Sequence, residues 1–289
     1  MIEEDRSSEF CSRVTGSHHL RDEKKSSLAR SPSKTSQLKH LTMIWKKLFG
    51  IASFALSSNL NQQGARTTED MALSNASLSP PLQKLVDDSK KLYVEKVAPT
   101  AASVSKEAWV TTAPGRVNLI GEHTDYTQGF VFPLAIEYST VVYGTGSLTV
   151  KEDSDAPTSA ILQFTSTYNN DKVETVEINV NTEPPSSGGP WIWYVAGTVA
   201  QYLKDLPPRG ATLKLNFAIA GDVPLGSGLS SSASLEVAVG RFVECALGDY
   251  AFKGETDKTA SPEKVRAIRC QKAENVWCHS PCGIMVSQG

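Results

Sequence analysis

The sequence ATLKLNFAIAGDVPLGSGLSSSAS, residues 211–234, contains a strand, a glycine-rich loop and the start of a helix in direct succession. Its first nine residues place apolar side chains at every second position, namely Leu213, Leu215, Phe217 and Ile219. Such alternation predicts a strand with one buried face. Beyond the loop, apolar residues follow at helical spacing, namely Leu235, Val239, Phe242 and Ala246. The stretch therefore predicts a strand that runs through a loop into a helix.

The loop itself has the composition of an anion-binding segment. Gly226 and Gly228 let the backbone approach a ligand closely, and a run of serines opens the helix. The N–H groups and the positive dipole end of that helix would face the anion. We therefore predict a phosphate-binding loop, although it contains neither Gly-Lys-Ser/Thr nor G-x-G-x-x-G.

A second polar loop, PGRVNLIGEHTDY at residues 114–126, follows a short predicted strand. Arg116, Glu122, His123 and Asp125 supply a fixed cation, two carboxylates and an imidazole, which together suit several hydroxyls and a phosphate. The alternative is a polar loop with an internal salt bridge. A zinc site is poorly supported, because no Cys or His at zinc-like spacing lies nearby.

The remaining pattern predicts mixed strands with helices to one side, which is an α+β fold. Strands are expected at 108–112, within 130–143, at 161–164 and at 173–180, and helices near 82–93, at 191–206 and from Leu235. A last helix should begin with Ser261 as N-cap and Pro262 in its first turn.

Composition limits the function classes. The 289 residues carry a net charge of −2, which gives no general attraction to nucleic acid. The longest apolar stretch, residues 48–56, is far short of the ~20 residues of a membrane-spanning helix. Five scattered cysteines favour a reducing compartment. We expect a soluble, intracellular protein.

Residues 1–78 are predicted to be a disordered extension, because they lack a sustained apolar period before Leu41. Residues 41–56 could instead form an amphipathic docking helix or part of a targeting presequence, although the early acidic run Glu3, Glu4, Asp5 argues against a transit peptide.

Both loops resemble those of a known family. PLGSGLSSSAS (224–234) resembles the ATP-binding loop of the GHMP superfamily of small-molecule kinases, and GRVNLIGEHTDY (115–126) resembles the signature of its galactokinases. KAENVWCHSPCGIM (272–285) resembles the segment that precedes the family's catalytic Asp. The resemblance implies that residues 79–285 form a GHMP-kinase N-terminal lobe, which is ribosomal S5 domain 2-like, with the C-terminal lobe missing.

The resemblance also implies a reaction, transfer of the ATP γ-phosphoryl group to the 1-hydroxyl of galactose, with ATP and Mg²⁺ as cofactors. The sugar would be bound by Glu122, His123, Thr124, Asp125 and the backbone of Gly283. The ATP phosphates would be bound by Gly226, Ser227, Gly228, Leu229, Ser230, Ser231 and Ser232.

Ser232 and Glu274 would hold Mg²⁺, which prefers few protein oxygens and several waters. Arg116 would be catalytic, by stabilising charge that develops on the transferred group. The alternatives are that Glu274 is a solvated helix residue and that Ser232 is a helix cap.

One position departs from the family. Where the family has the Asp that serves as base, this chain has Val286, which cannot accept a proton. We therefore expect very low activity. The resemblance further implies that the chain is truncated, because the family's second lobe is absent, and that residues 286–289 are a non-family tail. The hypothesis for this tail is translation of an unspliced intron.

Two other functions remain open, a noncatalytic galactose and ATP sensor and an N-acetylgalactosamine kinase. Fungal galactose sensors that resemble galactokinases lack a Ser-Ala pair in the phosphate loop, so the resemblance implies that the intact Ser232-Ala233 pair favours the kinase. The expected partners are galactose and ATP, with no nucleic acid and no membrane, and the expected state is a cytoplasmic monomer.

Overall fold

The computed structural model describes residues 55–57, 78–99, 107–121, 124, 129–257 and 259–284. All of them belong to one compact unit, residues 51–289. The predicted extension over 1–78 and the predicted tail over 286–289 lie almost wholly outside the described residues. Within the extension, strand β1 (Ala55–Ser57) is described, and it pairs with β2 of the sheet.

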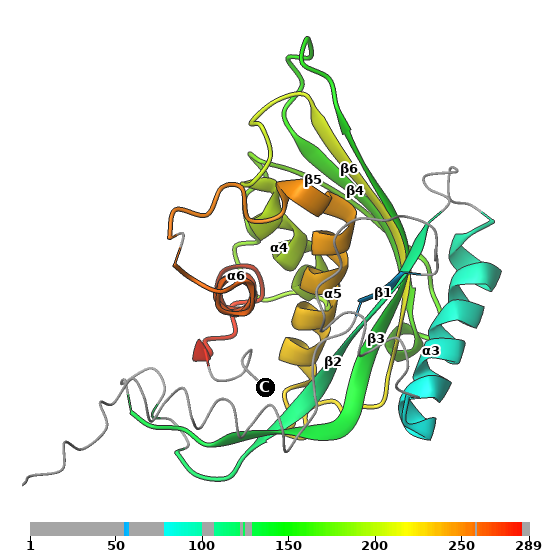
Figure 1. Ribbon diagram of the computed structural model, residues 1–289, viewed down its shortest axis with the longest axis vertical. Coiled ribbons are helices and arrows are strands. Elements are labelled where there is room, and N and C mark those ends of the chain that lie inside the picture. The colour runs from blue at the N-terminus through cyan, green and yellow to red at the C-terminus, as the bar shows by residue number, and fades with distance from the viewer. Residues whose placement is uncertain are drawn as a thin grey trace, which may run out of the picture. The chain divides into compact units, whose positions relative to one another are not determined.

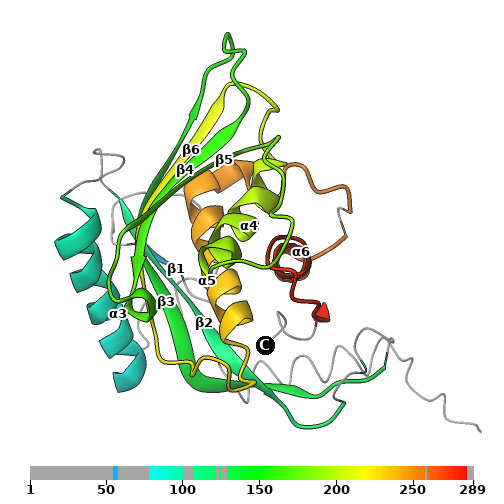
Figure 2. The same cartoon turned by 180° about the vertical axis from the view of Figure 1, so that it is seen from behind.

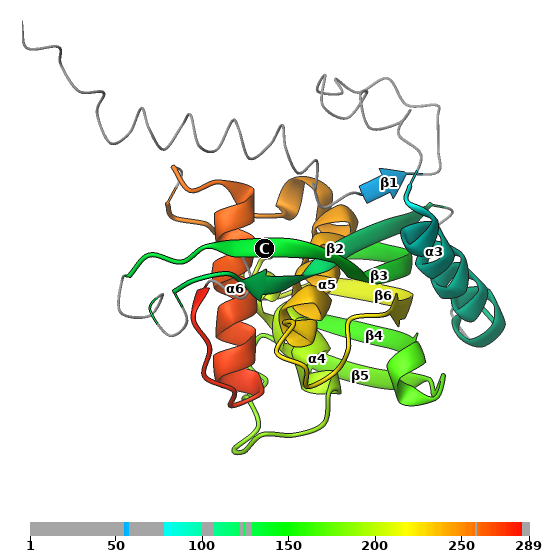
Figure 3. The same cartoon turned by 90° about the horizontal axis from the view of Figure 1, so that it is seen from below.

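A six-stranded sheet organises this unit, in the order β1-β2-β3-β6-β4-β5. Figure 3, seen from below, shows β2, β3, β6, β4 and β5 in this order across the sheet. The other strands are β2 (Ala108–Asn118), β3 (Pro133–Val150), β4 (Ser159–Ser166), β5 (Glu174–Asn179) and β6 (Ala211–Gly221). β4 and β6 are parallel, and every other neighbouring pair is antiparallel. The predicted strands are confirmed, although β2, β3 and β4 are longer than the sequence indicated. β2 continues to Asn118, which corrects the expectation that residues 114–126 are a loop, because residues 114–118 pair with β3.

Three helices pack on one face of the sheet and form the main core with it (Figure 1). They are α4 (Ile192–Leu203), α5 (Ser231–Leu247) and α6 (Pro262–Trp277). The predicted apolar face of β6 lies in this core, where Leu213, Leu215, Phe217 and Ile219 are fully buried. The Ser261 hydroxyl caps α6 by accepting a hydrogen bond from the Lys264 N–H, as expected.

Helix α3 (Pro80–Leu92) lies on the opposite face, which corrects the expectation that all helices lie to one side (Figures 1 and 2). Its Leu85 packs against Val141 of β3 and Ala220 of β6. These residues alternate with the core-facing ones, so they project from the other face. The alternation in β6 predicted one buried face. The other face is buried as well, and the sequence pattern did not indicate this because small alanines lie there.

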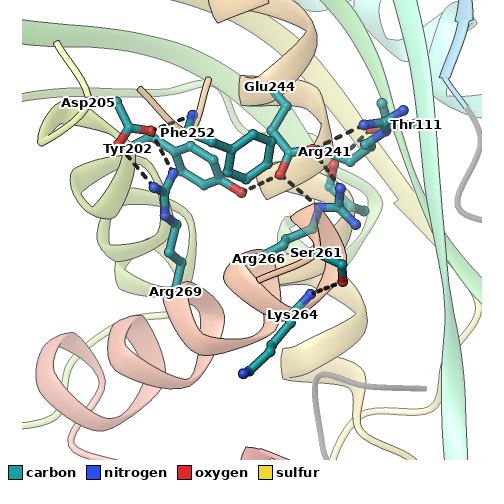
Figure 4. Close-up of polar contacts among 11 residues, drawn as sticks. Thr111, Tyr202, Asp205, Arg241, Glu244, Phe252, Ser261, Lys264, Arg266 and Arg269 are labelled. Carbon is teal, nitrogen blue, oxygen red and sulfur yellow. Dashed lines mark hydrogen bonds and ion pairs between the residues drawn. The ribbon is translucent and has the colours of Figure 1, made fainter. Parts of the chain in front are cut away.

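Two buried ion pairs hold α6 against its neighbours (Figure 4). Arg266 makes two hydrogen bonds of 2.8 and 2.7 Å to the Glu244 carboxylate of α5. Arg269 makes two bonds of 2.7 and 3.0 Å to Asp205, which follows α4. Burial raises the pKa of Tyr202 well above its usual value, and its hydroxyl donates to Glu244 at 2.7 Å. Such bidentate contacts fix orientation, so they set the direction of α6.

Crossing a lipid bilayer takes a long, apolar helix, and none of the described residues form one.

Candidate active site

The predicted phosphate-binding loop connects β6 to α5, and its tip is open. Gly226 and Gly228 adopt φ of 69° and 77°, the left-handed region that glycine tolerates. A side-chain carbon added at either glycine would meet nothing within 4 Å. The loop therefore leaves free space on the side where a ligand would approach its backbone.

Helix α5 begins without a side-chain cap. Its N-cap residue, Ser230, lies in the left-handed conformation with φ of 60°, and its side chain makes no capping hydrogen bond. The Ser227 hydroxyl is used inside the loop, where it donates to the Pro224 carbonyl at 2.7 Å. Because the first N–H groups of a helix have no partners within it, they and the helix dipole provide an anion site next to the two glycines.

The start of the loop is anchored by side chains that sequence reasoning missed. The Asp222 carboxylate accepts a hydrogen bond from the Ser139 N–H at 2.7 Å. The Tyr168 hydroxyl donates to the Val223 carbonyl at 3.2 Å, and burial raises the pKa of Tyr168 to about 12. These contacts join residues far apart in the chain, so no local pattern signals them.

The fold brings the two predicted motifs into contact. The Arg116 N–H of β2 donates to the Leu229 carbonyl of the phosphate loop at 3.0 Å. The β2–β3 register shifts between Pro114 and Arg116, at Gly115. A side-chain carbon at Gly115 would lie 2.9 Å from the Leu229 oxygen, so only glycine permits this approach. The Arg116 side chain is buried.

Three of the predicted sugar-binding residues, Glu122, His123 and Asp125, lie outside the described residues. Thr124 is described, and its hydroxyl lies 2.7 Å from the Gly121 carbonyl and 2.9 Å from the Phe130 carbonyl. The hydroxyl proton can serve only one of these oxygens at a time. Thr124 thus helps to close the loop between β2 and β3.

The predicted metal ligands, Ser232 and Glu274, contact each other across α5 and α6. The Ser232 hydroxyl donates to Oε1 of Glu274 at 2.9 Å. Oε2 of Glu274 has no hydrogen-bond partner within the described part of the chain. Burial raises the pKa of Glu274, and the hydrogen bond from Ser232 partly opposes this shift. A solvated helix residue and a helix cap are both excluded, because Glu274 is 4% exposed and the N-cap is Ser230.

These two side chains fit Mg²⁺. Both offer hard oxygen atoms, and the orphaned Oε2 is an acceptor that burial deprives of water. Two protein ligands leave the remaining positions to water and phosphate oxygens, which is the usual arrangement for this ion.

The segment after α6 folds back onto that helix. The Asn275 side chain accepts from the Cys282 N–H at 2.7 Å, and the Gln271 amide donates to the Cys282 carbonyl at 3.1 Å. Gly283, the predicted backbone contact of the sugar, is buried next to this residue. Val286 lies outside the described residues.

Sequence reasoning also missed Glu236, which is fully buried on α5. Burial, with a smaller contribution from the charge of Glu274, raises the pKa of Glu236 well above its usual value. The signal available in the sequence was its spacing of four residues from Ser232, which places both on one helix face.

Two family models match the segments that contain the predicted site residues. The family model described as "Galactokinase galactose-binding signature" matches residues 101–145, and that described as "GHMP kinases N terminal domain" matches residues 193–287. The first covers Arg116 and the β2–β3 loop, and the second covers the phosphate loop and Glu274. The two models therefore meet in space at the contact between β2 and the phosphate loop.

The curated relatives include galactokinases from bacteria and mammals. That of Haemophilus influenzae (strain PittGG) is 43% identical over 176 residues, covering 60% of this chain and 38% of the relative. That of Bos taurus is 34% identical over 218 residues, covering 73% of this chain and 47% of the relative. Among solved structures, Lactococcus lactis galactokinase complexed with galactose has a TM-score of 0.44 at 28% identity, covering 63% of this chain and 42% of that one. The chain spans less than half the length of these relatives.

Proposed function

We propose that this chain, which belongs to the galactokinase family of the GHMP kinases, binds ATP and galactose for phosphoryl transfer to the 1-hydroxyl of the sugar. The observation that carries the proposal is the hydrogen bond from the Arg116 N–H to the Leu229 carbonyl. It joins the segment that matches the galactose-binding signature to the phosphate loop. Phosphoryl transfer requires the acceptor hydroxyl and the γ-phosphate to be held together. This contact would hold the two segments that bind them next to each other.

The nucleotide part of the proposal rests on the loop and the helix start. Residues 226–232 would surround the phosphates with backbone N–H groups, and the dipole of α5 favours their negative charge. The open space beside Gly226 and Gly228 would admit the phosphate oxygens. Arg116, fixed by its buried position in β2, would supply positive charge for the transferred group.

Ser232 and Glu274 would hold the Mg²⁺ that accompanies ATP. When bound, the ion neutralises phosphate charge. The hydroxyl and the carboxylate are already joined at 2.9 Å, so binding costs little reorganisation of the two helices.

Galactose is the proposed sugar because the matching model is a galactose-binding signature. Glu122, His123 and Asp125 would bind its hydroxyls, with Thr124 holding the loop closed and the Gly283 backbone nearby. N-acetylgalactosamine is the competing substrate, and it serves as a comparison ligand in the test.

Calorimetric titration of the purified chain tests the proposal. We expect it to bind a nonhydrolysable ATP analogue with Mg²⁺, and to bind galactose more tightly than glucose or N-acetylgalactosamine. Failure to bind either the analogue or galactose would contradict the proposed function. Tighter binding of N-acetylgalactosamine would move the assignment to that sugar.

Turnover is a separate matter from binding. Val286 occupies the position where the family's base is expected, so we propose that galactose-dependent ATP turnover by this chain is very slow. Fast turnover would show that an Asp at this position is not required.

We further propose a cytoplasmic monomer, and light scattering of the purified chain tests the oligomeric state.

A further inference from the structure

Glu236 of α5 carries a carboxyl group that the fold buries without compensation. Its side chain is 0% exposed, and within the described part of the chain neither carboxyl oxygen has a hydrogen-bond partner. The arginines of α6 do not neutralise it, because Arg266 pairs with Glu244 and Arg269 pairs with Asp205. Burying an unpaired carboxyl costs more than burying an apolar side chain of the same size. Packing alone therefore gives no reason for a glutamate here.

Glu236 lies beside the proposed metal ligands. It follows Ser232 by four residues, so both side chains project from the same face of α5. The charge of Glu274 acts on the pKa of Glu236, second to burial. Cys270, one turn before Glu274 on α6, is affected in the same way, since burial first and the charge of Glu236 second raise the pKa of its thiol. Because Ser232 contacts Glu274 and Glu244 contacts Arg266, α5 and α6 run in opposite directions. Glu236, one turn after Ser232, therefore lies beside the turn of α6 between Cys270 and Glu274.

We propose that Glu236 is a positioning residue of the magnesium site, whose carboxyl oxygens accept hydrogen bonds from water molecules bound to an ion at Ser232 and Glu274. The inference rests on the proposed function. Mg²⁺ releases its waters reluctantly and keeps several of them when bound to protein. Groups that hydrogen-bond to the ligands of a metal ion, without contacting the ion, change the affinity of the site for that ion. The unpartnered oxygens, both of Glu236 and Oε2 of Glu274, provide acceptors for such waters.

The test is Mn²⁺ binding by the full chain, followed through the EPR signal of the free ion, with a nonhydrolysable ATP analogue present. Glu236→Leu removes both acceptors at similar volume, and we expect it to lower Mn²⁺ affinity 10–100-fold, the usual effect of such outer groups. The same variant should unfold at a temperature equal to or above that of the original chain, because an unpaired buried carboxyl is removed. Glu236→Gln keeps one amide oxygen as acceptor and should show a smaller loss of affinity.

Glu274→Gln distinguishes this inference from the proposed function. If Glu274→Gln weakens Mn²⁺ binding and Glu236→Leu does not, the inference is overturned and the proposed function stands. If neither variant alters Mn²⁺ binding, or if the original chain binds no Mn²⁺, the inference and the proposed metal site at Ser232 and Glu274 are both overturned. A lower unfolding temperature for Glu236→Leu together with weaker binding would assign Glu236 a structural role and also overturn the inference.

A matched control is Thr165→Val on β4. The Thr165 hydroxyl is likewise buried without a hydrogen-bond partner among the described residues. Its replacement removes an unpaired polar group away from α5 and α6, so Mn²⁺ affinity should not change. An equal loss of affinity in this control would show that the effect of Glu236→Leu is not local, and would overturn the inference.

Discussion

Gly115→Ala tests whether the close approach of β2 to the phosphate loop is needed for nucleotide binding. The added carbon would lie 2.9 Å from the Leu229 carbonyl oxygen, about 0.5 Å inside the ordinary contact distance of 3.4 Å. It would also lie 3.1 Å from Val223 and 3.2 Å from Ile136, so retreat in those directions is restricted. Overpacking of this kind costs about 1–3 kcal/mol. Relief requires Leu229 to move outward, which weakens its 3.0 Å hydrogen bond with the Arg116 N–H.

We expect Gly115→Ala to lower the free energy of unfolding by about 1–3 kcal/mol in urea titrations. The affinity for the ATP analogue should fall about 10-fold if ~1.4 kcal/mol of the strain reaches the loop. Gly188→Ala is the control, because it lies in an exposed loop and its added carbon meets a single atom at 3.2 Å. Unchanged nucleotide affinity in Gly115→Ala, with the expected loss of stability, would refute the coupling of β2 to the loop.

The remaining predictions concern the loop, the sugar, the helix interface and pH. Gly228→Val should lower affinity for the ATP analogue, because valine tolerates a φ of 77° poorly and would occupy the open side of the loop; calorimetry checks this. Asp125→Ala should weaken galactose binding by about 1–3 kcal/mol and leave nucleotide binding nearly unchanged, and equal losses for both ligands would indicate misfolding instead. Glu244→Ala should cost about 3–5 kcal/mol in urea unfolding, because it leaves the buried Arg266 charge unpaired; a loss below 1 kcal/mol would contradict this role. The raised pKa of Glu236 means that the folded state binds the carboxyl proton more tightly than the unfolded chain does. The stability that this proton contributes is therefore complete below about pH 4.5 and is lost as the pH rises toward the raised pKa. Glu236→Gln should remove this decline in the free energy of unfolding, measured by urea titrations at pH 5 and pH 8.

Local sequence patterns predicted the elements of the site well. The alternation in β6, the glycines of the loop and the Ser261 cap each depend on neighbours within a few residues, and all three are present in the structure. Longer-range features were not predictable in this way. The left-handed Ser230, a conformation that serine rarely adopts, is held by the surrounding fold, and no sequence rule indicates it.

The position of α3 shows the same limit. Its amphipathic period predicted a helix but not the face of the sheet that it covers. That choice depends on Val141 and Ala220, which lie on two different strands and form a common apolar surface only when β3 and β6 pair.

The sequence by itself determined the secondary structure around the loop, the absence of a strong charge imbalance and the residue types suited to phosphate and hydroxyl groups. Backbone propensity and side-chain chemistry are properties of short segments, so they can be read from the chain. Only the tertiary structure decided that Arg116 contacts the phosphate loop, that Ser232 and Glu274 share a hydrogen bond, and that Glu236 is buried beside them. These facts depend on β-sheet register and on the ion pairs that orient α6, which join residues tens of positions apart. Burial then raises the pKa of the Glu236 and Glu274 carboxyl groups, and no local sequence feature predicts that shift.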